Sequence, residues 1–213
     1  MKRLRLLGLL ASAAAAMTMA GCASPPDRYF TLVPIGADTA ATLRPAGPPL
    51  VIELLPLALP ERLARPQMVV RQASDASSAE VAVLDQHRWA SSFENELRDA
   101  LASGVATRLG AVDASRSGGN VGRAPGQPAW RIAVQVRQFD AIEGVRVDAA
   151  LSWSIRRSDQ DTSAGCQWQA SETAGSGIDG VAQSAQRVTV RATEAIARHV
   201  AALAAGGTSD CKP

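Results

Sequence analysis

The sequence predicts an α+β fold, a two-layer α/β sandwich in which a mixed, largely antiparallel sheet packs against two long amphipathic helices. Two observations lead to this prediction. Apolar and polar residues alternate along residues 130–137 and 145–156, which is typical of strands that bury one face of a sheet. Apolar residues recur every three or four positions along residues 86–109 and 179–205, which is typical of helices that bury one stripe.

Short strands are expected before the first helix, in runs rich in aliphatic, aromatic and β-branched residues. They comprise residues 28–33, 50–55, 67–71 and 80–84. A turn at residues 74–78 would join the last two into a hairpin. Glu53 is an acid inside an apolar strand: one interpretation is a buried acid with a raised pKa, and the commoner case, an outward-facing position, is the one expected. The apolar stretch 54–60 has two interpretations, a core strand followed by a turn or an exposed edge that docks a partner.

The first helix is predicted to begin after Asp85, a suitable N-cap residue, and to end at Gly110. Trp89 is the first residue of its apolar stripe. On the opposite side, Glu94 and Arg98 lie one turn apart and are expected to form a weak ion pair.

A meander of three strands is predicted after a loop at residues 114–128. Gly144 lies in the turn between its first two strands, and the alternation around residues 166–170 indicates the third. The last helix is expected to end at the two glycines 206–207.

The N-terminus has the features of an export signal. Basic residues precede a short apolar run, and small residues follow up to Cys22. The order Met19-Ala20-Gly21-Cys22 resembles the lipobox of bacterial lipoproteins, which are cut before the cysteine and acylated there with chains such as palmitate. The alternative is an ordinary secretory signal with a chance cysteine near the cut.

This interpretation divides the chain into a signal peptide at residues 1–21, a lipidated tether at 22–27 and one periplasmic domain at 28–213. The length of the mature chain suits a single core. The formal net charge of +2 includes three charges in the signal, so the mature chain is near −1. No nucleic-acid partner is expected, because such partners need a clustered positive surface.

The cysteines allow one disulfide. After lipidation of Cys22, only Cys166 and Cys211 remain, and an oxidising compartment favours their pairing. Two unpaired thiols are the alternative, because the sequence gives no distance between them.

No catalytic, cofactor or metal site is predicted. The two histidines, His87 and His199, belong to no cluster with metal-ligand spacing. His87 is expected to begin the first helix, and His199 lies on the apolar stripe of the last helix as a structural residue. No nucleophile elbow, P-loop or dinucleotide motif is present in the sequence.

Two motifs resemble the ABC-type transport auxiliary lipoproteins, a family that includes paraquat-inducible lipoproteins of intermembrane transport systems. The first runs from Leu59-Pro60 to Arg65-Pro66-Gln67, and the second is Arg88-Trp89 at the expected start of a helix. Ala64 departs from the family pattern, since an acidic residue is common before Arg-Pro-Gln.

The resemblance implies a non-enzymatic lipoprotein of the Gram-negative envelope that faces the periplasm and supports membrane integrity. Its partner would be an MCE-domain protein of an intermembrane lipid transport system, with a homo-oligomer also allowed. Ala23, in place of Asp after the lipidated cysteine, implies the outer membrane. The alternatives are an outer-membrane assembly lipoprotein that binds a β-barrel, and an envelope hydrolase or cell-wall binder.

Overall fold

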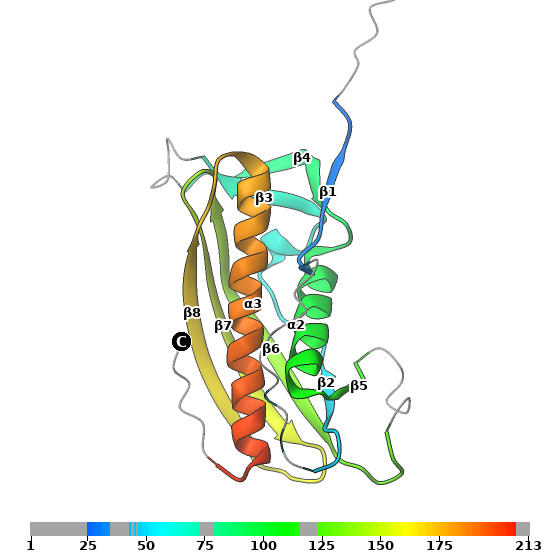
Figure 1. Cartoon of the computed structure of the whole chain (residues 1–213). Coiled ribbons are helices and arrows are strands. Elements are labelled where there is room, and N and C mark those ends of the chain that lie inside the picture. The colour runs from blue at the N-terminus through cyan, green and yellow to red at the C-terminus, as the bar shows by residue number, and fades with distance from the viewer. Residues whose placement is uncertain are drawn as a thin grey trace, which may run out of the picture.

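The computed structural model describes residues 25–34, 43, 45, 47–72, 79–115 and 123–207. They form one eight-stranded mixed sheet with two helices packed on it, which confirms the predicted α+β class (Figure 1). The strands are β1 (Arg28–Phe30), β2 (Val51–Leu54), β3 (Gln67–Arg71), β4 (Ala82–Trp89), β5 (Val112–Asp113), β6 (Ala129–Ile142), β7 (Arg146–Arg157) and β8 (Ser163–Thr173). The helices are α2 (Phe93–Leu109) and α3 (Gly177–Ala204), and a 3-10 turn, η1, spans Glu61–Leu63.

The three longest strands form the predicted antiparallel meander. β6 pairs with β7, and β7 pairs with β8. In these ladders Ile132 lies opposite Ile155 and Trp153 lies opposite Cys166, and all four residues are buried. Alternate residues such as Gln135 are exposed. The prediction of one covered and one solvated face is therefore confirmed.

The other edge of β6 is shared by two short groups of strands. β2 pairs in parallel with the first residues of β6, and β5 pairs with β2. β3 pairs in parallel with Ala141 and Ile142 at the end of β6, and the sheet continues through β4 to β1. Between the two groups, Ala58 bridges to Gln135, so the chain after β2 follows β6. The long ladders are antiparallel, and most of the short ones are parallel.

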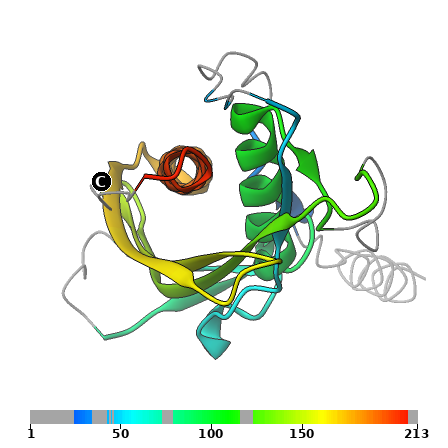
Figure 2. The same cartoon turned by 90° about the horizontal axis from the view of Figure 1, so that it is seen from below.

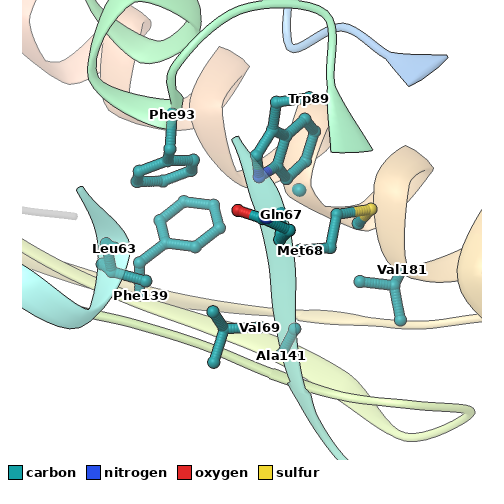
Figure 3. A pocket seen from close by; sticks show the side chains of 10 residues that line it. Leu63, Gln67, Met68, Val69, Trp89, Phe93, Phe139, Ala141 and Val181 are labelled. Atoms are coloured by element: carbon teal, nitrogen blue, oxygen red, sulfur yellow. The ribbon is translucent and has the colours of Figure 1, made fainter. Parts of the chain in front are cut away.

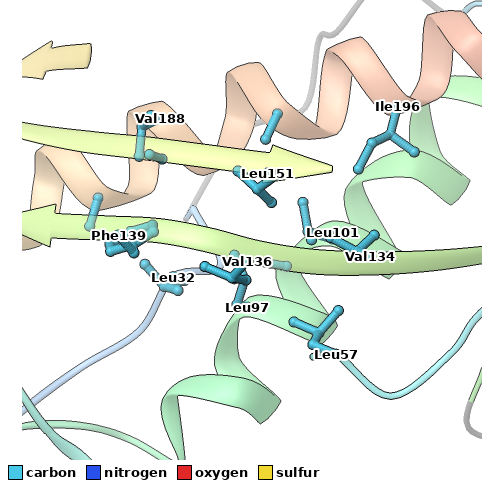
Figure 4. Packing of buried hydrophobic residues seen from close by; sticks show 14 of the residues in the cluster. Leu32, Leu57, Leu97, Leu101, Val134, Val136, Phe139, Leu151, Val188 and Ile196 are labelled. Atoms are coloured by element: carbon cyan, nitrogen blue, oxygen red, sulfur yellow. The ribbon is translucent and has the colours of Figure 1, made fainter. Parts of the chain in front are cut away.

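The main hydrophobic core lies between the sheet and the two helices (Figure 4). Leu101 of α2 and Ile196 of α3 are fully buried in it. The sheet curves around α3 (Figure 2), and α2 packs directly against α3. Leu54 and Leu57 also belong to this core, which supports the core interpretation of the stretch 54–60.

The predicted start of the first helix is wrong. Asp85 and His87 lie in β4, which continues to Trp89, and the helix begins only at Phe93. The true N-cap is Ser92, whose hydroxyl accepts a hydrogen bond from the amide of Asn95 at 3.3 Å. These residues form a strand despite their helical periodicity, because β3 and β1 pair with the two edges of β4. The predicted end of the helix is confirmed, since Gly110 caps α2 in the left-handed conformation.

The predicted ion pair between Glu94 and Arg98 does not form. The Arg98 guanidinium instead donates to the carbonyl oxygens of Leu54 and Ser115, at 3.2 and 2.9 Å, and so ties α2 to the β2 side of the sheet. The two-residue strand β5 was not predicted, because it is too short to show a period. The predicted turn at residues 74–78 lies outside the described residues.

Candidate functional site

The two family motifs come together at one joint, which we call the motif junction. The amide of Trp89 donates to the carbonyl of Pro66 at 2.7 Å, and the amide of Phe93 donates to the carbonyl of Arg65 at 3.4 Å. The amide of Leu63 closes η1 on the carbonyl of Pro60 at 2.9 Å. The loop between β2 and β3 is thus fixed by backbone bonds to the end of β4 and the start of α2.

Aromatic side chains fill the motif junction (Figure 3). The ring centroids of Trp89 and Phe93 are 5.8 Å apart, and Phe93 meets Phe139 edge-on at 4.8 Å. Met68 and Val181 close the cluster from β3 and α3. The cavity that remains is about 20 Å³, which is room for about one water molecule. The junction is therefore a packed joint and not a ligand pocket.

The other motif residues lie around this joint. Arg88 donates from Nε to the carbonyl of Asp85 at 2.7 Å and lies 4.0 Å from a carboxylate oxygen of Asp27. Gln67 lies opposite Arg88 in the β3–β4 ladder, and Pro66 is exposed. Leu59 packs partly against the core. These side chains shape the loop, and none of them forms a cluster with catalytic geometry.

A second site holds the N-terminal segment, and we call it the tether clamp: Thr31, Leu32, Ser91, Glu96 and Gln186. Glu96, in the first turn of α2, is only 8% exposed. Its carboxylate accepts hydrogen bonds from the Thr31 hydroxyl at 2.8 Å, the Leu32 amide at 3.1 Å and the Ser91 hydroxyl at 3.2 Å. Gln186 of α3 donates to the carbonyl of Thr31 at 2.8 Å. Both helices thus hold the chain just after β1.

The tether clamp was not predicted from the sequence. One signal could have found it: Glu96 lies three residues after Phe93 and four before Ala100, so it interrupts the apolar stripe of the helix. An acid in such a position is buried when donors reach it, and here they come from the helix start and from the N-terminal segment.

Both histidines contact aromatic side chains of the fold. His199 is 3% exposed, and its Nδ1 accepts a hydrogen bond from Trp153 Nε1 at 2.9 Å. Burial lowers the pKa of His199 below its usual value of 6.5. His87, in β4, stacks on Phe30 with ring centroids 6.2 Å apart. No group of three or more potential metal ligands occurs among the described residues.

The remaining predicted residues have separate positions. Glu53 faces outward, as expected, and pairs with Arg131 at 2.8 Å. Cys166 is buried and disulfide-bonded. Cys22 and Cys211 lie outside the described residues, so lipidation of the first and the Cys166–Cys211 pairing stay predictions.

Comparison with known proteins identifies the class of this molecule. The family model for the ABC-type transport auxiliary lipoprotein component matches residues 30–197, from the end of β1 into α3. The chain belongs to this family. No curated protein matches the chain.

Solved structures share the fold. An uncharacterised protein matches with a TM-score of 0.61 and 17% identity, covering 83% of this chain and 99% of its own. A Xanthomonas campestris protein of the DUF330 family matches with a TM-score of 0.58 and 16% identity, covering 84% of this chain and 98% of its own. Membership in this family makes the protein a lipoprotein-like auxiliary component of a transport system. Within the described part of the chain, no helix has the length and apolarity that a membrane span requires.

Proposed function

We propose that this protein is an outer-membrane lipoprotein that faces the periplasm and holds the outer end of an MCE-type lipid transport conduit. The proposal joins the predicted lipid at Cys22 to the family's auxiliary role in transport. In this role the protein carries out no chemical step. Its work is mechanical, because it must keep a partner at a fixed distance from the membrane.

The tether clamp is the observation that carries this proposal. The clamp holds Thr31 and Leu32, only nine and ten residues after Cys22, by side chains from both helices. A tether of residues 23–27 spans at most about 20 Å when extended. An anchor at Cys22 would therefore keep the β1 end of the domain near the membrane surface, at the top of Figure 1. A loosely attached N-terminus would allow no such control.

Membrane sorting tests the anchor. Cys22→Ala should release the protein from the membrane fraction, because the acyl chains attach there. Ala23→Asp should move the protein from the outer to the inner membrane, and Ala23→Ser should leave it in place. Density-gradient separation of the two membranes, followed by immunoblotting, measures both outcomes. An Ala23→Asp protein that stays in the outer membrane would contradict the sorting rule used here.

Capture from crosslinked cells tests the partner. Full-length protein is crosslinked in the envelope, solubilised and purified, and the proteins that come with it are identified. Recovery of an MCE-domain protein supports the conduit role. Recovery of a β-barrel with its assembly factors and no MCE-domain protein would replace it with the assembly-lipoprotein alternative.

A further inference from the structure

A groove of about 260 Å³ opens where α2 and α3 cross. Gly104 of α2 and Thr193 of α3 touch there: a Cβ atom built on Gly104 would lie 2.6 Å from Thr193 Cγ2. Val33 and Pro34 line the groove from the N-terminal segment, directly after the tether clamp. Ser103 lines it as well and is exposed to solvent. Apart from one arginine, only small or aliphatic residues line the groove among the described residues.

Arg108 carries the only charge among the described residues that line this groove. It is only 9% exposed, and its Nη1 donates to the Gly104 carbonyl at 3.2 Å. Its Nε is buried without a hydrogen-bond partner, and no ion pair joins it to a carboxylate in the described part of the chain. Burying a cation with an unused donor costs desolvation free energy, and an anion bound beside it would offset this cost.

The hydroxyl groups that line the groove already donate hydrogen bonds within their own helices. Each donates to a carbonyl oxygen of its own helix, four residues back: Ser103 to Asp99 at 2.7 Å, Thr107 to Ser103 at 2.8 Å, Thr189 to Ala185 at 2.8 Å and Thr193 to Thr189 at 2.8 Å. Their oxygen atoms can still accept hydrogen bonds. Thr189 and Thr193 are only 2% exposed, so the groove offers one cationic side chain and two accessible acceptors, Ser103 and Thr107.

The position of Arg108 at the end of α2 explains part of this arrangement. A cation in the last turn of a helix interacts favourably with the helix dipole and the final carbonyls. An exposed arginine would gain the same interaction at no desolvation cost. The helix end therefore accounts for the sign of the charge but not for its burial.

We propose that this groove binds a glycerol phosphate group, either free or as the headgroup of a phospholipid. The phosphate would take the Nη2 group of Arg108, which is not fully buried and has no hydrogen-bond partner among the described residues. The planar fork of an arginine suits phosphate oxygens. The glycerol hydroxyls would donate to the side-chain oxygens of Ser103 and Thr107, which line the groove and are exposed. The carbon skeleton would lie against Val33, which borders the groove. This inference stands on the groove alone, and it does not require the proposed conduit role.

Calorimetric titration of the full-length protein tests the proposal. The protein is kept in a polyoxyethylene detergent, which has neither phosphate nor polyol groups. The probes are sn-glycerol 3-phosphate, inorganic phosphate, glycerol, and dihexanoyl phosphatidylglycerol below its micelle concentration. We expect saturable binding of sn-glycerol 3-phosphate with a dissociation constant of about 1 mM or lower, weaker binding of inorganic phosphate, and none of glycerol.

Matched variants connect the binding to the groove. Arg108→Gln removes the charge and should weaken binding at least about tenfold, the usual effect of losing a charge-assisted hydrogen bond. Arg198→Gln, at an exposed arginine of α3 paired with Glu194 at 4.0 Å, should leave binding unchanged. Ser103→Leu fills the groove from its exposed side without touching the charge and should also abolish binding. Ser103→Leu keeps the test valid if Arg108→Gln fails to fold.

The outcomes separate the two sources of the ligand. Binding of both glycerol 3-phosphate and the short-chain lipid assigns the groove to a lipid headgroup, and binding of glycerol 3-phosphate alone assigns it to a free phosphate ester. No saturable binding of either probe, or binding that survives both Arg108→Gln and Ser103→Leu, would overturn the proposal. If the probes bind but the crosslinking experiment recovers no MCE-domain protein, the result counts against the conduit role and not against the groove.

Discussion

The motif junction and the tether clamp lie at the same end of the molecule and both contact α2, but they are stabilised by different physics. The junction is an aromatic cluster of Trp89, Phe93 and Phe139 with almost no free volume. The clamp is a buried carboxylate, Glu96, that hydrogen-bond donors satisfy and that no cation pairs with in the described part of the chain. The junction stabilises the fold through the apolar area that it buries, and the clamp stabilises it through hydrogen bonds that require their donors to lie in fixed positions.

This difference decides what each region can do. Apolar packing is tolerant of direction, so the aromatic cluster by itself selects no single path for the chain, and the backbone bonds to Pro66 and Arg65 set the path of the loop there. A buried carboxylate is stable only when its donors are in place, so the clamp selects one position for Thr31 and Leu32. The junction therefore holds the domain together, and the clamp determines where the tether leaves it.

The largest effect is expected at the junction. Trp89→Ala should lower the free energy of unfolding by about 3–5 kcal/mol, because it removes a buried aromatic ring and leaves a cavity. Urea unfolding of the full-length protein, followed by circular dichroism, measures this loss. Val83→Ala, at a residue of the same strand that is 41% exposed, is the control and should cost well under about 1 kcal/mol. Equal losses in the two variants would mean that the junction is not a packed joint.

The clamp should respond less, and in a graded way. Glu96→Ala leaves the buried amide of Leu32 without an acceptor and should cost about 2–3 kcal/mol. Glu96→Gln retains a side-chain oxygen for this amide and should cost about half as much. The same unfolding measurement gives both values. If the glutamine variant is as unstable as the alanine variant, the charge and not the hydrogen-bond geometry holds the clamp.

Release of the tether can be measured separately from stability. When Glu96→Ala opens the clamp, limited proteolysis should cut the chain near Thr31 faster than in the unchanged protein, while cleavage of the rest of the domain changes little. Val83→Ala should leave both rates unchanged. Uniform acceleration of all cuts would show a general loss of stability and no local release.

The sequence predicted the parts whose pattern is long and local. The meander of β6, β7 and β8 was predicted because period-two alternation persists over many residues, and α3 was predicted because its stripe is long. Trp89 was correctly assigned to the core but to the wrong element, since a single buried tryptophan fits the end of a strand as well as a helical stripe. The period alone could not show that β1 and β3 would pair with the two edges of β4.

The sites depend on contacts that the sequence does not display. The motif residues were identified through the family resemblance, but their meeting requires the loop at Pro66 to reach the end of β4. Glu96 meets Thr31 across 65 positions of sequence. Arg108 resembles an ordinary solvated helix cation until Gly104 lets α3 approach closely enough to bury it. Burial of a polar side chain is a property of the packed fold and has no local period.

A third buried polar contact extends the comparison to pH. Burial lowers the pKa of His199 in the folded protein, so the unfolded chain binds a proton at this residue more readily than the folded protein does. The contribution of His199 to stability should therefore be constant well above pH 6.5 and fall as the pH decreases below it. His199→Gln should reduce this dependence, since glutamine does not titrate and its oxygen can accept from Trp153. His87→Gln, in β4, is the matched control and should preserve it. Unfolding at pH 7.5 and 5.5 measures the difference, and an equal slope in all three proteins would contradict the assignment.

The smallest effect is expected where the same N-terminal segment meets α3 at the surface. Arg28 and Asp179 form an ion pair at 2.7 Å, but their side chains are 51% and 57% exposed. Water and salt screen such a pair, so Asp179→Asn should change the free energy of unfolding by less than about 0.5 kcal/mol and leave the proteolysis of the tether unchanged. Measurement at low and high salt isolates the pair, because only a charge interaction weakens with ionic strength. A loss as large as that of Glu96→Ala would mean that the surface pair, and not the buried carboxylate, positions the tether. The expected contrast follows from burial alone: both contacts join the same segment to a helix, and only one of them excludes water.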